Sequence, residues 1–524
     1  MPVAGAHAPF DRARAGLAAV LCATQVALAA PALSGPTLWI DEAYCAVLAR
    51  RPFGAIHAAL VHDSSPPLYY DLLHVWRGVF GESPLALRSL SLLLSCIVTV
   101  TLLHGAGRFL SADPARGRRA AAWAAAFWAL APTAAGYAVE VRSYALLVAT
   151  SLGLTLAVLR HLDGGARRDL AAVVLLGALA VYTHVVAWAL VAALAAAAPL
   201  RTRAPAGLVP LGLAFAGIGV LYVPWAVVLV EQVSVADRFI GWVRPEWVAW
   251  GPLLTFAGWV PGGLRLPFVP PAVVLPLAAQ AVNGLVVAAA LVVAGRRERD
   301  PAGEPRRPWA VHVLLATVLV YVGLLYAVSL LARPVLLAGR TDVPLLPLVA
   351  CVAGAAVVRV RPGALVGGVM AAQMLVLTAL AHTLPTGPDE RPLEPLVADR
   401  IRPGDVVVCT GLTRPAMAYL TGERVPIVSY PLEAEQRMGQ FNPQDIAARL
   451  DLVAERARVL ERIEAALRPG GRLFLVSSTH PFQRPLHDTL DRAPFLDLET
   501  VDDPPELGLR RYGERLFVAR YRQR

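Results

Sequence analysis

Residues 309–332 read WAVHVLLATVLVYVGLLYAVSLLA, an apolar run without a single Asp, Glu, Lys or Arg. A helix that crosses the hydrocarbon core of a bilayer needs about 20 such residues. The whole chain has the same character, since 56% of its 524 residues are hydrophobic and 16% are charged, and its mean hydropathy is +0.55. This composition predicts a polytopic α-helical membrane protein rather than a soluble multidomain protein.

Similar apolar runs recur through the first 382 residues and predict about eleven spanning helices, several of them shorter than the ideal length. Arginine clusters occupy every second connection between these runs, which predicts that the N-terminus and all the clusters are cytoplasmic. The formal charge of +10 therefore reflects orientation in the membrane, and we expect no nucleic-acid partner. The predicted spans are 15–34, 86–106, 120–136, 143–159, 170–182, 185–200, 207–229, 271–294, 309–332, 344–358 and 363–382.

The remaining connections are predicted to face outward, among them a long first outer loop and everything after residue 383. Residues 44–60 and 68–80 of that loop place apolar side chains at helical spacing, which predicts helices lying on the membrane surface. The tryptophans between 242 and 259 predict another interfacial segment. Tyr182-Thr183-His184 is expected at the outer tip of a tight hairpin over 170–200.

The composition changes after a proline-rich linker near residue 385, where a water-soluble part begins. Apolar runs at 405–408, 472–476 and 515–519 predict strands, and 444–467 predicts an amphipathic helix. Pro469-Gly470-Gly471 is interpreted as a turn into the second of these strands. We therefore divide the chain into a transmembrane module, 1–384, and a small extracytoplasmic α/β domain, 385–524.

The sequence offers little for a metal ion or a disulfide. The five cysteines show no metal-ligand spacing and imply no disulfide framework. Asp41, Glu42, Asp63 and His62 are the remaining candidate ligands, and they do not form a convincing set. We expect no cofactor, with a divalent metal ion left as the alternative.

Four polar clusters fall on the predicted outer face. They are Asp41-Glu42 after the first span, His62-Asp63-Ser64-Ser65-Pro66-Pro67-Leu68-Tyr69-Tyr70 in the first outer loop, Glu140-Val141-Arg142-Ser143-Tyr144 before the fourth span, and Arg340-Thr341-Asp342 after residues 309–332. Arginine forks bind phosphate oxygens with two parallel hydrogen bonds, and a carboxylate can accept the proton of a hydroxyl group. An outer cavity with both groups suits a reaction between an anionic lipid-linked donor and a hydroxyl acceptor.

Each cluster also has a purely structural interpretation. Asp41-Glu42 could cap the N-terminus of the helix at 44–60. Arg142 could pair with Glu140, and Arg340 with Asp342, as interfacial ion pairs. His184, a candidate pocket residue, could simply belong to a polar hairpin tip.

The order of these motifs resembles the GT-C glycosyltransferases over roughly residues 10–385. The shared features are Asp-Glu in the first outer loop, Asp-x-x-Pro-Pro-Leu-Tyr-Tyr, Glu-x-Arg-x-Tyr-Ala-Leu-Leu, and a late arginine before a proline-rich span. The most similar branch comprises bacterial relatives of protein O-mannosyltransferases and the aminoarabinose transferases. One departure is Ser65, which stands where family members often have His before the two prolines.

The resemblance implies a role for several residues. Asp41 matches the general base, Glu42 its neighbour that helps to hold the acceptor, and Asp63 a second acid of the outer loop. Arg142 and Arg340 match positions near the donor phosphate. The other candidate pocket residues are His62, Tyr69, Glu140, Tyr144 and His184.

The hypothesis from the sequence is therefore an inverting membrane glycosyltransferase of a bacterial plasma membrane. Its donor would be a polyprenyl-phosphate-linked sugar, and its acceptor a glycan, lipid or protein. The first alternative is a transporter or lipid-carrier flippase, which would need polar residues near the midplane of its spans. The second is a non-catalytic scaffold whose outer domain recruits a partner.

Overall fold

The computed structural model describes residues 12–34, 37–61, 63–202, 204–235, 292–293, 298–299, 305–306, 309–337, 339–383, 400–410, 413–432, 453–478, 484–502, 510–511 and 514–523. The chain forms two compact units. The helical unit comprises Met1–Ala32, Arg88–Trp225 and Val243–Pro385. The loop–sheet unit comprises Leu33–Leu87, Ala226–Trp242 and Thr386–Arg524, and thus joins the first outer loop to the C-terminal part.

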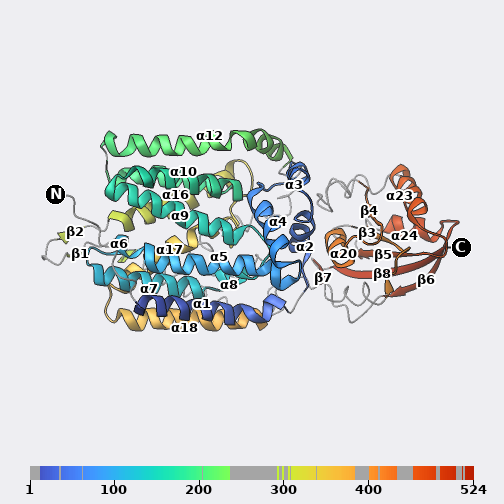
Figure 1. Ribbon diagram of the computed structural model, residues 1–524, viewed down its shortest axis with the longest axis horizontal. Helices are drawn as coiled ribbons and strands as arrows, with labels where there is room; N and C mark the ends of the chain where they lie inside the picture. Colours follow the sequence, from blue (N-terminus) through green and yellow to red (C-terminus); the bar gives the residue numbers. More distant parts are fainter. Residues whose placement is uncertain are drawn as a thin grey trace. The chain divides into compact units, whose positions relative to one another are not determined.

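Long apolar helices dominate the helical unit (Figure 1). Five helices of the described chain, α1, α5, α9, α12 and α16, are long and apolar enough to cross a membrane. The helices are α1 (Arg12–Ser34), α5 (Pro84–Gly105), α6 (Gly107–Leu110), α7 (Pro114–Leu130), α8 (Pro132–Ala138), α9 (Tyr144–Gly164), α10 (Arg167–Thr183), α11 (Ala187–Ala197), α12 (Pro205–Val235), α16 (Trp309–Leu331), α17 (Leu346–Val357) and α18 (Gly363–Thr383). The described part of this unit also contains two 3-10 turns, Ala198–Leu200 and Val343–Leu345. It further contains a two-stranded ribbon, β1 (Glu298–Arg299) with β2 (Pro305–Arg306).

These helices lie where the sequence predicts spans, except that the run at 271–294 falls almost entirely outside the described residues. The number of crossings stays a prediction. The run at 120–136 is divided into α7 and α8, because Ala131 precedes Pro132 and adopts an extended conformation with ψ of 130°. The hairpin over 170–200 is present, with α10 ending at Thr183 and α11 beginning at Ala187.

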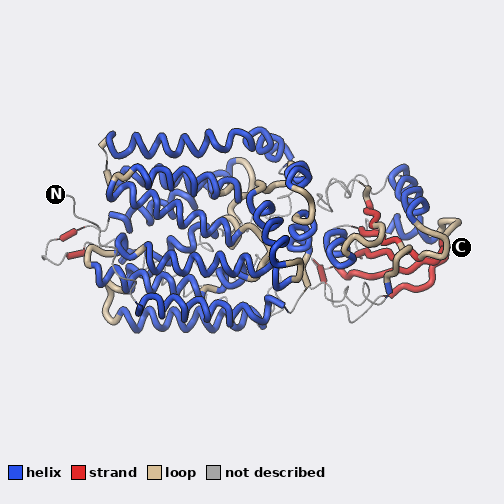
Figure 2. Tube along the Cα trace, viewed as in Figure 1, coloured by secondary structure: helices blue, strands red, loops and turns tan. Residues whose placement is uncertain are grey.

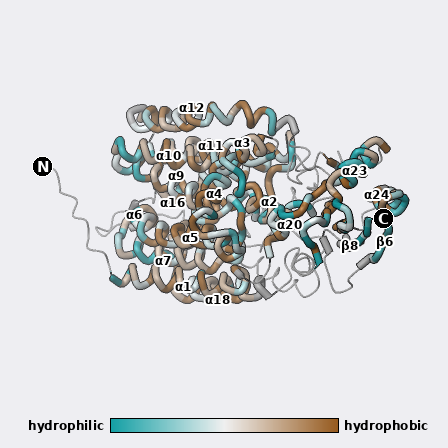
Figure 3. The backbone as a smooth tube through the Cα atoms, turned by 45° about the vertical axis from the view of Figure 1, so that its right-hand side comes forward, coloured by the Kyte–Doolittle hydropathy of each residue, from teal (hydrophilic) through white to brown (hydrophobic). Residues whose placement is uncertain are grey.

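The helices of this unit pack through small and apolar side chains, with α7 against α17, α9 against α10, and α11 against α16. Figure 3 shows mostly white to brown, hydrophobic colours in the middle of the helices labelled α7, α9, α10 and α16. A buried polar ladder joins α1 to α5, where Gln25 donates to Ser95 Oγ at 2.9 Å and accepts from Thr99 Oγ1 at 2.7 Å. Polar side chains within apolar helices form hydrogen bonds with one another in this way, because the hydrocarbon core of a membrane contains no water to bind them.

Three short helices of the segment predicted to be the first outer loop belong to the loop–sheet unit: α2 (Ile40–Leu48), α3 (Phe53–Leu60) and α4 (Leu68–Phe80). The prediction of one helix over 44–60 is wrong. Pro52 lacks a backbone N–H and disfavours helical conformation at Arg51, so the helix is interrupted there and α3 starts afresh. The predicted helix at 68–80 coincides with α4.

The C-terminal part of the same unit holds a mixed sheet in the order β4-β3-β5-β8-β6, with β7 beside β8 (Figure 2). Strand β3 pairs in parallel with β4 and β5, whereas β8 runs antiparallel to β5 and β6. The strands are β3 (Val406–Thr410), β4 (Ile427–Tyr430), β5 (Arg472–Ser478), β6 (Leu496–Asp502), β7 (Arg510–Arg511) and β8 (Glu514–Gln523).

Helices cover both faces of this sheet. Val406 and Val408 pack in one core with α23 (Val453–Ala466) and α24 (Arg484–Asp491), while Val407 and Cys409 pack in another core with α20 (Arg414–Thr421). Successive residues of β3 alternate between the two cores because side chains of a strand point alternately to opposite faces. The sheet is therefore buried on both sides.

The three strands predicted from sequence lie at β3, β5 and β8. Gly470 has a φ of 76°, and the N–H of Gly471 donates to Arg468 O at 2.8 Å, which confirms the turn before β5. The predicted helix at 444–467 appears as α23, and its first residues lie outside the described part. Strands β4 and β6 were not predicted, since β4 has four residues and β6 alternates with acidic side chains.

We expect Gly354→Ala to destabilise the helical unit by about 1–3 kcal/mol, the usual cost of overpacking. A Cβ atom at Gly354 would lie 2.3 Å from the backbone oxygen of Ala120 on α7, a group that cannot rotate away. Thermal unfolding in detergent would measure the loss. The matched control is Gly323→Ala on α16, where nothing lies within 4 Å of the added atom. Equal unfolding temperatures for the two variants would contradict the packing argument.

Candidate functional site

The acidic pair lies in the first turn of α2, which starts at Ile40, earlier than the sequence suggested. Trp39 is the N-cap residue in an extended conformation, and its N–H donates to Glu42 Oε2 at 3.3 Å. Glu42 is 1% exposed, whereas Asp41 is half-buried. Negative charge at this position is stabilised by the positive end of the helix dipole. Capping therefore occupies Glu42, and Asp41 presents its carboxylate from the same turn.

Asp63, in the loop between α3 and α4, is 3% exposed. Its Oδ1 accepts the N–H of Ser64 at 2.6 Å, and its Oδ2 lies 3.5 Å from the hydroxyl oxygens of Tyr44 and Tyr70. Tyr44 is on α2, one turn after Asp41, so both share a face of that helix. We call Asp41, Glu42, Tyr44, Asp63 and Tyr70 the acidic cluster.

Two further side chains support this cluster. Tyr69 is fully buried and its ring lies 5.9 Å from that of Tyr70, beside the cluster. Gln232 near the end of α12 donates its side-chain amide to Leu60 O at 2.8 Å and so holds the loop that carries Asp63. Sequence reasoning missed Gln232, because a lone amide at the end of an apolar helix gives no signal of its partner. His62 lies outside the described residues.

A second set of candidates gathers in the helical unit, around the start of α9. Arg142 precedes that helix and places its guanidinium carbon 5.8 Å from the centre of the Tyr144 ring. The ring of His184, at the end of α10, stacks with Tyr144 at 6.1 Å and an angle of 30°. Glu140 accepts a hydrogen bond from Ser91 through its backbone oxygen at 2.6 Å, which fixes the segment before α9 to α5.

Arg340 lies on the connection that follows α16, and neutral side chains hold the backbone on both sides of it. The Tyr137 hydroxyl donates to the carbonyl of Gly339, and the Tyr321 hydroxyl donates to that of Thr341. The Thr341 hydroxyl in turn accepts the N–H of Leu337 at 2.8 Å. Tyr137 and Tyr321 were not among the predicted site residues; the only sequence signal was that Tyr137 stands three residues before Glu140.

These groups also influence one another electrostatically. Burial, followed by the charges of Arg142 and Arg340, lowers the pKa of His184 to about 4. Burial raises the pKa of Tyr137, with Tyr144 and Glu140 acting in the same direction and Arg340 in the opposite one. We call Arg142, Arg340, His184, Tyr137 and Tyr144 the guanidinium cluster. His184 is neutral at pH 7, so the positive charge of this cluster comes from its arginines.

The two clusters offer complementary chemistry. Arginines stay charged at any physiological pH and present planar forks that match phosphate oxygens. A half-buried carboxylate such as Asp41 is a suitable general base for a hydroxyl group. Within the described residues no group of three or more His, Cys, Asp and Glu side chains is placed to hold a metal ion.

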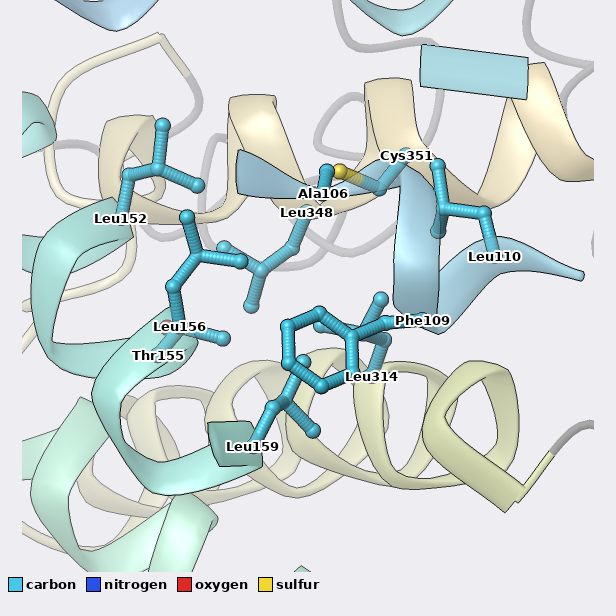
Figure 4. A pocket seen from close by; sticks show the side chains of 10 residues that line it. All are labelled: Ala106, Phe109, Leu110, Leu152, Thr155, Leu156, Leu159, Leu314, Leu348 and Cys351. Carbon is cyan, nitrogen blue, oxygen red and sulfur yellow. The ribbon is translucent and has the colours of Figure 1, made fainter. Parts of the chain in front are cut away.

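A separate pocket lies among the helices and is lined mainly by apolar side chains, with no charged group (Figure 4). Leu152, Leu156 and Leu159 of α9 face Phe109 and Leu314 there. Leu152 is eight residues beyond Tyr144, at least about 12 Å along the helix from the guanidinium cluster. Because the pocket holds no charged group, it cannot supply the chemistry expected of the site.

The fold is that of the GT-C glycosyltransferases, and with its apolar helices it makes the chain a multi-pass membrane protein. ArnT from Cupriavidus metallidurans in the apo state is similar over 97% of this chain and 98% of its own, with a TM-score of 0.62 and 14% identity. The same protein bound to undecaprenyl phosphate gives a TM-score of 0.61 with 16% identity, covering 96% and 98% of the two chains. The oligosaccharyltransferase of Archaeoglobus fulgidus, in complex with Zn and sulfate, gives 0.51 with 12% identity, covering 88% of this chain and 68% of its own. No protein-family model and no curated protein sequence matches the chain.

The lowered pKa of His184 predicts a specific pH dependence of stability. An unfolded chain would protonate this imidazole near pH 6.5, whereas the folded protein does so only near pH 4. The unfolded state binds more protons between these values, so the His184 contribution is complete above about pH 6.5 and is lost as the pH falls towards 4. When the pH falls from 7 to 5, the unfolding temperature of the His184→Gln variant should therefore fall less than that of the unsubstituted protein. Thermal unfolding in detergent would measure both. Parallel pH curves for the two proteins would refute the assignment.

Proposed function

We propose that this chain is a membrane glycosyltransferase that moves a sugar from a polyprenyl-phosphate carrier to an acceptor hydroxyl group. The observation that carries the proposal is the guanidinium cluster. Arg142 lies over the ring of Tyr144, which stacks with His184, and the Tyr137 hydroxyl holds the backbone beside Arg340. Permanent positive charge beside an apolar helix suits the phosphate of a lipid carrier. The binding of undecaprenyl phosphate by a protein of the same fold supports this choice of ligand.

In the proposed reaction the acceptor oxygen attacks the anomeric carbon of the donor sugar from the face opposite the phosphate. Asp41 takes the proton of the acceptor hydroxyl as the new C–O bond forms. The bond between the anomeric carbon and the phosphate oxygen breaks, and its electron pair leaves with the polyprenyl phosphate. The anomeric configuration is inverted by this direct displacement.

The guanidinium groups assist because negative charge grows on the lipid phosphate as it leaves. Arg142 and Arg340 are assigned to that phosphate. Neutral His184 and Tyr137 line the same cluster and add hydrogen-bonding capacity without competing charge. Glu42 and Asp63 are assigned to the acceptor side, where their burial fixes the position of α2.

The alternation of arginine clusters supports an N-terminus in the cytoplasm and an acceptor outside it. We infer that the protein resides in a bacterial plasma membrane and that the part after residue 385 is an extracytoplasmic α/β domain. The acceptor is a glycan, a lipid or a protein. The proposed steps use only the side chains named above, and a divalent metal ion stays the alternative.

A direct assay uses the purified protein in detergent with a synthetic polyprenyl-phosphate sugar whose sugar is radiolabelled. Release of polyprenyl phosphate, or transfer of label to an added acceptor, is the expected result without any ion gradient. A flippase would instead move the intact lipid across a vesicle membrane, and a scaffold would leave it unchanged. Either of the last two results would overturn the proposal.

Asp41→Asn is expected to lower kcat by about 100-fold or more, the usual contribution of a general base. The amide has nearly the same size but cannot accept the hydroxyl proton. Transfer rates at saturating donor would measure the loss. Asp71→Asn is the matched control, since Asp71 is on α4 of the same loop and its carboxylate pairs with His57 at 3.0 Å. Near-normal transfer by the Asp41 variant would exclude it as the base.

Arg340→Ala is expected to raise the apparent KM for the donor by about 10–100-fold, the value of a charge-assisted hydrogen bond. Arg340→Lys keeps the charge but loses the planar fork, so it should restore binding only in part. Donor titrations at fixed acceptor concentration measure the effect, with Arg333→Ala in the same connection as control. A change in acceptor KM alone would place Arg340 elsewhere.

A further inference from the structure

The C-terminal end of α2, like its N-terminal end, is held by hydrogen bonds, although it carries no group of the acidic cluster. Ala49 O, at the C-cap, accepts hydrogen bonds from His74 Nδ1 at 2.8 Å and from Arg77 Nε at 3.2 Å, both on α4. Arg77 also pairs with Glu82, just beyond the end of α4. The carbonyl end of α2 is therefore attached to α4 through two cationic or polar side chains.

Arg50, the next residue, extends this attachment to the C-terminal sheet. Its Nε donates to Glu82 Oε2 at 3.0 Å, and its two terminal nitrogens donate to the carbonyls of Ala418 at 3.0 Å and Tyr419 at 3.3 Å. These carbonyls lie in the last turn of α20, where the helix dipole favours a cation. The Arg50 side chain is only 17% exposed, so water screens these bonds weakly.

Tyr419 closes the same network from the other side. Its hydroxyl donates to the backbone oxygen of Glu82 at 2.8 Å, and its ring lies 5.6 Å from the guanidinium carbon of Arg50. The opposite side of α20 is built into the sheet, because Ala416 and Met417 pack in the core with Phe474 of β5. A continuous chain of contacts thus runs from the sheet through α20 and Arg50 to α2.

We propose that the C-terminal sheet serves as a frame for α2 and that Arg50 is the positioning residue through which it acts. A nine-residue helix is about 13 Å long, so a displacement of its C-terminal end moves the first turn as well. That turn carries Asp41, and a misplacement of about 1 Å can cost a reaction about 100-fold. The catalytic consequence rests on the proposed function, in which Asp41 is the base; the structural part does not.

Arg50→Ala is expected to lower kcat by about 10–100-fold while the donor KM stays within about twofold. Arg50→Lys should recover part of the loss, since an ammonium group can bond Glu82 or one carbonyl but cannot bridge them. The matched control is Arg51→Ala. Arg51 pairs with Glu423 at 2.6 Å, but both side chains are 41% and 32% exposed, and such a pair contributes little.

Hydrogen exchange of the full-length protein in detergent, without substrate, separates this inference from the proposed function. Arg50→Ala should speed exchange of the α2 amides, and Tyr419→Phe, which removes only one hydroxyl, should do so to a smaller degree. Arg51→Ala should leave exchange unchanged. Exchange of the α2 amides could be faster in Arg50→Ala while neither the variants nor the unsubstituted protein transfers sugar. That result would support the positioning role of Arg50 and would contradict the proposed function.

Unchanged exchange of α2 in Arg50→Ala would overturn the positioning role, whatever the activity. The same holds if Arg50→Ala and Arg51→Ala lower kcat equally, because a general weakening of the surface would then explain both. A rise in donor KM with unchanged kcat would likewise contradict a role through α2.

Discussion

The burial of two carboxylates, Glu42 and Asp63, is the constraint on which the arrangement of the first outer loop depends. Removing an ionised carboxylate from water costs several kcal/mol unless donors replace the lost hydration. Donors close in sequence contribute: the N–H of Trp39 donates to Glu42, and the N–H of Ser64 and the hydroxyl groups of Tyr44 and Tyr70 donate to Asp63. The start of α2 and the turn into α4 bring these donors into range.

In the helical unit, neutral hydroxyl groups lie beside the charged residue Arg340. Neutral hydroxyl groups of Tyr137 and Tyr321 hold the carbonyls on either side of Arg340 and so help to fix the backbone of that residue. Burial, with the charges of Arg142 and Arg340 acting in the same direction, lowers the pKa of His184 to about 4. The imidazole stays neutral, and the cluster avoids a third cation beside two arginines.

The elements that follow from local sequence were predictable, and those that depend on distant partners were not. Apolar length is a local property, so the long helices coincide with the predicted runs, as α16 does with 309–332. The roles that motif order assigns to Asp41, Arg142 and Arg340 stay predictions. The break before α3 could have been predicted from Pro52 alone. Gln232, by contrast, acts on Leu60, 172 residues away, and Tyr137 on Gly339, 202 residues away.

Arg50 is the strongest case of such a distant dependence, since Ala418 is 368 residues further along the chain. The entropy cost of closing so long a loop grows only with the logarithm of its length, and it is shared when the partner is already folded. The C-terminal sheet has two apolar cores of its own, and α20 belongs to one of them. A small number of hydrogen bonds can therefore suffice to attach α2 to it. The C-terminal sheet thereby holds the C-terminal end of α2, the helix whose first turn carries Asp41 and Glu42.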